Sequence, residues 1–213
     1  IRRGDMEGKA GSTLLLHNVP GTLCDRVLLV GLGKEKEFRE KEFCQAIRVA
    51  VKTLNETGAF DGTVFLTEIP VKKRSVGWRI RQATVIAQET TYRFDQFKSK
   101  KDEVRRPLRK LTFAVERRNE LAPAEEALQQ GLAIAEGMAL AKNLGNLPGN
   151  VCTPAHLAET AQKIALEHSL DCQVLERADM ESLGMGSLLS VAKGSVQAPK
   201  LIVLQHKGGK AGD

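Results

Sequence analysis

The sequence has no long hydrophobic run and no secretory leader. Its 213 residues contain no window of about 18 consecutive apolar residues, the length that a membrane-spanning helix needs. The chain opens with Ile1-Arg2-Arg3-Gly4-Asp5 and has no apolar segment behind these charges, as a signal peptide would. We therefore expect no membrane association and a cytoplasmic location. Because no Met starts the chain, we also expect it to begin inside a longer gene product.

Cysteines are few and widely separated, and none belongs to a Cys-x-x-Cys pair: Cys24, Cys44, Cys152 and Cys172. Without a signal peptide they indicate reduced thiols, and their spacing does not fit a structural zinc site. Hydrophobic residues make up 42% of the chain and charged residues 27%, a balance that excludes wholesale disorder. The length fits one large domain or two small ones.

The motifs of several enzyme classes are also missing. There is no Gly-x-Ser-x-Gly elbow, no His-Glu-x-x-His and no Walker A loop. Gly31-Leu32-Gly33 follows a predicted strand, but the third glycine of a dinucleotide-binding loop is replaced by Lys36. The four histidines are isolated from one another. The residues alone therefore show no active site, and we assign no catalytic and no metal-binding residue.

Positive charge is concentrated in two segments, 72–74 and 98–110. The chain carries 32 basic and 26 acidic residues, and the second segment alone has seven basic residues against two acidic ones. A basic patch binds a phosphate backbone by releasing counterions. The alternative, which we favour on composition, is a solvated surface that keeps the protein soluble. The candidate nucleic-acid contacts are Lys72, Lys73, Arg74, Lys98, Lys100, Lys101, Arg105, Arg106, Arg109 and Lys110.

Strands and helices are predicted to alternate up to about residue 118. Apolar residues at helical spacing predict one helix from Phe43 to Gly58 and another that is capped by Ser75 and reaches Phe94. Such alternation indicates an α/β domain with crossover connections, here spanning 1–118. Short apolar runs bounded by turn residues predict the strands over 14–16, 26–30, 64–69 and 108–115.

Residues 119–146 are predicted to form one long helix. Pro123 suits its first turn and Gly145 its C-terminal cap. Apolar residues occupy two adjacent faces, which is typical of a helix buried between two bodies. We therefore predict that this helix links two domains.

Residues 147–213 are predicted to begin a second α/β domain. Thr153-Pro154 favours a helix start. A loop-rich stretch is expected between residues 184 and 194, framed by glycines. Regular elements are predicted as strands over 171–175 and 200–205 and a short helix over 178–183.

The string from Ala141 to Pro148, followed by Thr153-Pro154-x-x-Leu157-Ala158, resembles the domain junction of leucyl aminopeptidases, also called cytosol aminopeptidases. The likeness covers essentially the whole chain. Gly149 departs from it, since many members carry a second Pro or an Ala there. Further similar segments are 183–195 and 201–207 and, in the bacterial aminopeptidase A branch, 14–20, 26–34 and 105–110.

The resemblance implies a macro-domain-like N-terminal α/β domain, a long linker helix and the beginning of a catalytic α/β domain. It implies a homohexamer that hydrolyses N-terminal residues, often leucine, from peptides. It also implies two divalent metal ions in the full-length protein, manganese or zinc, with magnesium a further option. These ions would polarise the peptide carbonyl and activate a water molecule.

The family's metal ligands belong to motifs of the types GKGxTFDxGG and NTDAEGR, and this sequence contains neither. No catalytic residue can be carried over, so we expect this polypeptide alone to bind no metal and to be inactive. The bacterial branch implies an alternative role in DNA binding through segments 72–74 and 98–110. Likeness to macro domains suggests an ADP-ribose module by analogy of fold alone, and we expect no ADP-ribose binding.

Overall fold

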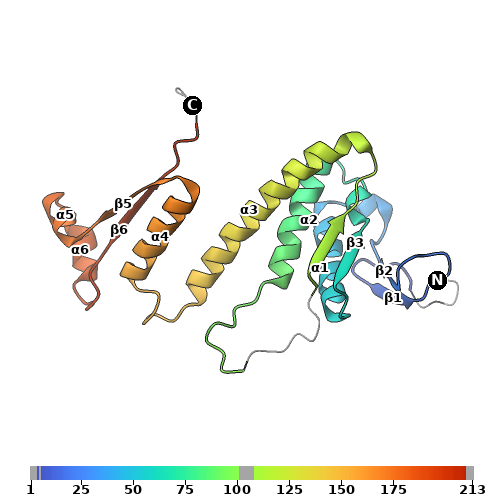
Figure 1. Ribbon diagram of the computed structural model, residues 1–213, viewed down its shortest axis with the longest axis horizontal. Coiled ribbons are helices and arrows are strands. Elements are labelled where there is room, and N and C mark those ends of the chain that lie inside the picture. Colours follow the sequence, from blue (N-terminus) through green and yellow to red (C-terminus); the bar gives the residue numbers. More distant parts are fainter. Residues whose placement is uncertain (1–3, 5, 101–107, 210–213) are drawn as a thin grey trace. The chain divides into compact units, whose positions relative to one another are not determined.

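A computed structural model describes residue 4 and residues 6–100 and 108–209 (Figure 1). The chain divides into two compact bodies, which we name the first unit, residues 1–142, and the second unit, residues 143–213. Each unit is described by itself. The three predicted segments 1–118, 119–146 and 147–213 remain a prediction, because the division of the chain falls inside the long helix.

The first unit opens with a pair of antiparallel strands. β1 (Thr13–His17) and β2 (Arg26–Val30) confirm the two predicted strands, and they pair along their full lengths, which was not predicted. The pairing continues beyond them through Gly31, whose N–H donates to the Ser12 carbonyl at 2.8 Å. A β-carbon on Gly31 would lie 2.1 Å from the Lys9 carbonyl oxygen. This glycine therefore serves close approach of two backbones, not phosphate binding.

Helix α1 (Glu40–Glu56) supplies the largest buried side chains of the first unit. The predicted stripe lies on its buried face, and apolar side chains of neighbouring elements pack around it. Burial of one amphipathic face contributes more to such a helix than intrinsic propensity does. Three side chains of this helix are fully buried: Phe43, Ile47 and Val51.

Helix α2 (Val76–Thr91) packs against α1 (Figure 1). The predicted N-cap is confirmed, because the Ser75 hydroxyl accepts a hydrogen bond from the Trp78 N–H at 3.2 Å. The helix ends at Thr91, so the prediction that it reaches Phe94 is wrong. Threonine hydroxyls that bond back to helix carbonyls favour this end: Thr91 Oγ1 donates to the Ala87 carbonyl at 2.9 Å.

A parallel pair of strands completes the first unit. β3 (Asp61–Val64) pairs with β4 (Lys110–Phe113), and α2 lies in the crossover between them, as the predicted α/β pattern requires. The predicted strand over 64–69 is wrong, since β3 ends where that strand was expected to start. The cause is buried Thr67, whose hydroxyl donates to the Ala114 carbonyl at 2.7 Å and holds Leu66–Glu68 in a 3-10 turn, η2.

Helix α3 (Leu121–Asn146) is one continuous helix of 26 residues, as predicted. It packs against α2, where Gly131 faces Thr84 so closely that an added β-carbon would lie 2.8 Å from the Thr84 β-carbon. Gly145 lies inside the helix, so its predicted role as a cap is wrong; Pro148 ends helical structure instead. Within the described residues, no helix is long and apolar enough to cross a membrane.

The second unit joins helices to an antiparallel pair of strands. The prediction of a loop-rich stretch between 184 and 194 is wrong, because most of it forms a helix. Thr153 caps the first helix by accepting a hydrogen bond from the His156 N–H at 3.3 Å, which confirms the predicted start. The elements are α4 (Pro154–His168), β5 (Asp171–Leu175), α5 (Arg177–Ser182), α6 (Gly186–Ala192) and β6 (Leu201–Gln205), with β5 paired to β6.

Few large apolar side chains of the second unit are fully buried. Its buried residues include three alanines of α4, and Met180 is its largest fully buried side chain. Leu166 is 84% exposed and Val191 is 85% exposed. A core this small contributes little to stability. The first unit therefore holds most of the buried apolar structure of the described chain.

The cysteines are free thiols, and only Cys24 among them is exposed. Burial raises the pKa of the Cys44 thiol, and the nearby Arg48 cation opposes this effect more weakly. Because the thiolate is the reactive form, the raised pKa makes Cys44 less reactive than an ordinary cysteine.

Candidate functional site

The first basic segment leads into the N-terminus of α2. Lys72 and Lys73 are exposed. Arg74 is anchored: its Nε donates a hydrogen bond to Glu40 Oε1 at 2.7 Å, and its guanidinium carbon lies 5.2 Å from the centroid of the Trp78 ring. The hydrogen bond to Glu40 raises the pKa of Arg74. Arg74 thus joins the start of α1 to the segment before α2, and Lys72 and Lys73 add two exposed cations beside it.

The second basic segment lies partly outside the described residues, since these omit Lys101, Arg105 and Arg106. Lys98 and Lys100 are exposed. The guanidinium carbon of Arg109 lies 5.4 Å from the centroid of the Phe60 ring. The Arg109 N–H donates to the Phe60 carbonyl at 2.8 Å, and exposed Lys110 begins β4.

These two segments lie at opposite ends of α1. Arg74 binds Glu40, the first residue of that helix, whereas the Leu108 N–H donates to Asn55 Oδ1 near its last turn at 3.3 Å. A helix of 17 residues is about 25 Å long at a rise of about 1.5 Å per residue. The described cations therefore do not converge on one small ligand, and only a long polyanion would reach both ends.

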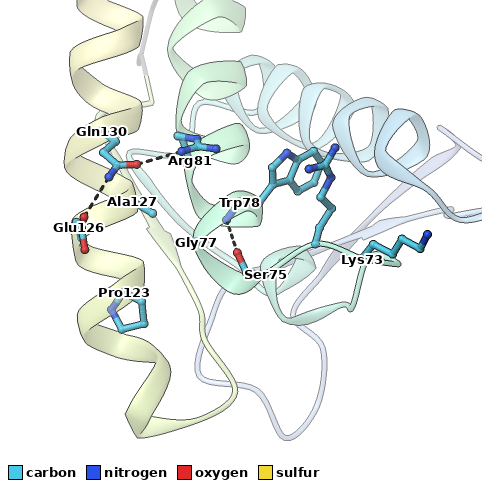
Figure 2. A pocket seen from close by; sticks show the side chains of 10 residues that line it. Lys73, Ser75, Gly77, Trp78, Arg81, Pro123, Glu126, Ala127 and Gln130 are labelled. Carbon is cyan, nitrogen blue, oxygen red and sulfur yellow. Dashed lines mark hydrogen bonds between the residues drawn. The ribbon is translucent and has the colours of Figure 1, made fainter. Parts of the chain in front are cut away.

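An open pocket of about 440 Å³ lies between α2 and α3 within the first unit (Figure 2). Arg81 Nη1 donates to Gln130 Oε1 at 3.1 Å, and Gln130 Nε2 donates to Glu126 Oε1 at 3.2 Å. Its lining also includes Lys73, Arg74, Ser75, Gly77, Trp78, Pro123 and Ala127. No histidine or cysteine lines it.

The polar groups of this pocket are largely committed to one another. Ser75 caps α2, and the Arg81–Gln130–Glu126 chain ties α3 to α2. Sequence analysis missed this chain, because residues 49 positions apart show no local signal of contact. The arrangement orients two helices and holds no activated nucleophile or general base.

A second pocket of about 370 Å³ lies farther along the same two helices. Lys142 Nζ lies 5.1 Å from the centroid of the Tyr92 ring and 3.8 Å from Glu89 Oε1. Arg48 of α1 contacts the same carboxylate at 2.9 Å. These contacts link α1, α2 and α3 within the first unit, and the charges of Arg48, Glu89 and Lys142 are engaged in them.

Metal-binding side chains do not gather in the described structure. Among residue 4 and residues 6–100 and 108–209, no group of three His, Cys, Asp or Glu side chains lies close enough to hold a metal ion. This donor set does not fit the two-metal centre that the resemblance implies, so no catalytic step is derived through metal ions for these residues.

The string at the domain junction forms a tight turn before α4. The N–H groups of Val151 and Cys152 both donate to the Pro148 carbonyl at 2.9 Å, and Thr153 then caps the helix. Gly149 has a negative φ and open space around its α-carbon. Its departure from the family pattern therefore causes no steric conflict in this turn.

The crossover of α2 between parallel β3 and β4 defines the first unit as α/β, and the second unit combines helices with a strand pair. The N-terminal-domain model of the cytosol aminopeptidase family matches residues 1–101, and the catalytic-domain model of that family matches residues 139–213. The chain belongs to the cytosol aminopeptidase family.

Curated relatives match the chain over its whole length. A "Probable cytosol aminopeptidase" of Dechloromonas aromatica (strain RCB) is 73% identical over 213 residues, which are 100% of this chain and 43% of the relative. A protein of the same name from Chromobacterium violaceum is 57% identical over 210 residues, covering 99% of this chain and 40% of the relative. The chain thus spans about two fifths of the length of these relatives.

Solved structures share the fold. The bottromycin maturation enzyme BotP matches with a TM-score of 0.80 and 27% identity, over 95% of this chain and 42% of that one. A mutant of tomato leucine aminopeptidase matches with a TM-score of 0.77 and 23% identity, over 99% of this chain and 41% of that one. The predicted α/β fold class is confirmed by this likeness.

Proposed function

We propose that this chain supplies the N-terminal domain and the first part of the catalytic domain of a metal-dependent aminopeptidase that releases N-terminal residues from peptides. The observation that carries the proposal is the 73% identity over all 213 residues to a "Probable cytosol aminopeptidase". The two family models, which match in the expected order, support it. Because the chain covers 43% of that relative, the activity belongs to a longer protein.

The proposal extends to cofactors and assembly. A solved structure of BotP, 27% identical to this chain, is described as a complex with Mn, which supports a divalent metal in the longer protein, manganese or zinc. Two ions and a homohexamer rest on the sequence resemblance. The word "cytosol" in the names of the relatives supports a cytoplasmic location. Within this assembly the first unit serves as scaffold, since ion pairs tie its helices and loops to one another: Arg74 with Glu40, and Arg48 and Lys142 with Glu89.

A chimera tests the proposed function. The segment of the Dechloromonas relative that matches this chain is replaced by the 213 residues, and hydrolysis of leucine-p-nitroanilide is measured with Mn²⁺ or Zn²⁺. We expect kcat/KM within about tenfold of the parent, because a scaffold that keeps the active-site geometry changes the barrier by less than about 1.4 kcal/mol. The parent enzyme and an EDTA-treated chimera are the controls. A chimera that folds and assembles like the parent without hydrolysing the substrate would contradict the proposal.

The 213-residue chain alone is expected to show no turnover of leucine-p-nitroanilide with cobalt, zinc or manganese. The physical reason is the absence of a metal-ligand cluster among the described residues. Release of p-nitroaniline is followed at equal protein concentration for the chain and the chimera. Metal-dependent turnover by the chain would overturn this expectation and would place donors among the undescribed residues.

The second candidate function is binding of duplex DNA. The observation that favours it is that every described lysine and arginine of the two basic segments is exposed. Each phosphate contact that is lost lowers the slope of log affinity against log salt by about 0.9. We expect the slope, measured by fluorescence anisotropy of labelled DNA, to fall by about 2–3 when three exposed lysines are neutralised: Lys72→Gln, Lys73→Gln and Lys110→Gln.

The matched control removes the same charge elsewhere, at three exposed lysines outside both segments: Lys36→Gln, Lys41→Gln and Lys52→Gln. We expect this variant to keep the salt slope of the wild type. Equal slopes for both variants, or affinity that does not depend on salt, would remove this candidate.

A further inference from the structure

Arg79 is a buried arginine on the core face of α2. Arg79 is 7% exposed. It shares one face of α2 with Ala83 and Ile86, which both belong to the apolar core of the first unit. Positions four and seven residues apart share one face of a helix. The sequence pattern contains this signal, but a cationic residue at such a position is usually expected to face solvent.

The guanidinium of Arg79 lacks an acceptor among the described residues. Its Nε is buried without a hydrogen-bond partner, and its side chain forms no hydrogen bond or ion pair with another described residue. Three other arginines of the first unit have side-chain partners: Arg48 with Glu89, Arg74 with Glu40, and Arg81 with Gln130. Helix α2 carries two arginines, Arg79 and Arg81, and Arg79 is the buried one and the one without such a partner.

A buried donor without a partner opposes folding, and the buried Nε of Arg79 is such a donor. Lysine or histidine escapes this cost by losing a proton, but arginine stays protonated in proteins. Water accepts hydrogen bonds without neutralising the charge. The group that removes the cost most effectively is an anion with two oxygens, because these match the two parallel N–H donors of a guanidinium.

The surroundings also favour an anion. Side chains of a helix lean toward its N-terminus, so Arg79 leans toward the start of α2, where unpaired amides carry positive partial charge. Helix α2 packs against η2, the turn that follows β3, and Val76 and Ile80 near its start belong to one apolar cluster with Phe113, the last residue of β4. The start of α2 therefore lies at the carboxyl ends of parallel β3 and β4, the edge at which open α/β sheets bind ligands.

We propose that Arg79 anchors a binding site for a small oxyanion, a phosphate or carboxylate group held at the carboxyl ends of β3 and β4. The site is separate from peptide hydrolysis and does not depend on the proposed function. Exposed Lys72 and Lys73, which precede α2, add positive potential at the same end of the helix. Arg79 binds the ligand and orients it; no chemical step is assigned to it.

Thermal unfolding of the full chain tests the site. Inorganic phosphate is titrated at constant ionic strength, with potassium chloride as the balancing salt, and unfolding is followed by the fluorescence of Trp78. A ligand that binds only the folded state raises Tm with its concentration. We expect a progressive rise in Tm for the wild type and its loss in Arg79→Met, which keeps the aliphatic volume. The control, Arg93→Met, removes an exposed arginine and keeps the rise.

A second measurement needs no variant and decides the question if Arg79→Met does not fold. The Arg79 Nε–H resonance of the ¹⁵N-labelled chain is followed during additions of phosphate, acetate and chloride. We expect phosphate or acetate to shift it saturably and chloride to leave it unchanged, and the stronger of the two oxyanions identifies the ligand class. A resonance indifferent to both oxyanions, or an equal rise in Tm in Arg79→Met and the wild type, would overturn the proposal.

Discussion

Replacing Phe43 by alanine is expected to destabilise the first unit by about 3–5 kcal/mol, the usual cost of truncating a fully buried phenylalanine. Phe43 is 0% exposed and lies at the centre of the core formed by α1, α2 and β3. Its ring centroid is 5.6 Å from that of Trp78, so truncation also removes an aromatic contact. The variant loses the transfer free energy of the ring and leaves a cavity that rigid neighbours fill incompletely.

The measurement uses the only tryptophan of the sequence, which belongs to the first unit. Urea unfolding followed by Trp78 fluorescence reports that unit without a signal from the second. The control is Phe65→Ala, because Phe65 is 63% exposed and its truncation should change stability by less than about 0.5 kcal/mol. Similar shifts of the unfolding midpoint for both variants would show that Phe43 is not a core residue.

Alanine substitutions at two glycines of α3 are expected to act in opposite directions. An exposed helical glycine replaced by alanine stabilises by about 0.5–1 kcal/mol, and Gly137 has open space around it. Gly131 is buried, and an added β-carbon would lie 2.8 Å from the Thr84 β-carbon and 3.0 Å from the Arg81 carbonyl oxygen. Overpacking of this kind costs about 1–3 kcal/mol, so Gly131→Ala should be the less stable variant by about that amount.

Each glycine variant serves as the control of the other, since both gain the same helix propensity. Fluorescence-detected unfolding gives the difference in their free energies, and the helix content from circular dichroism shows that α3 still forms. Equal stabilisation by both substitutions would mean that α3 does not pack against α2 at Gly131.

Local signals account for the parts of the fold that sequence analysis predicted. The apolar stripe beginning at Phe43 and the N-cap at Ser75 depend on residues close together in the sequence, so α1 and the start of α2 could be predicted from the sequence. The same holds for β1, β2, β5 and for α3 as a single helix. The apolar run over 64–69 failed as a strand, because the buried hydroxyl of Thr67 bonds to a residue 47 positions away.

The candidate sites show the same limit. Composition alone located the basic segments 72–74 and 98–110, but only the structure shows that α1 separates their described residues. The Arg81–Gln130 contact depends on how α3 packs on α2. Arg79 was missed because a charge on a buried face contradicts the hydrophobic pattern that was being sought. Helix α6 was missed because glycines flank and begin it.

The parallel pairing of β3 with β4 has a consequence for the order of folding. β1 and β2 form a local pair, closed by a short connection between His17 and Arg26, whereas Asp61 meets Lys110 across 49 positions. Closing the longer loop costs more chain entropy, and contacts distant in sequence slow the folding of small domains. We therefore expect the β1–β2 pair and α1 to form early, and β3 to pair with β4 late, after α2 has packed against α1.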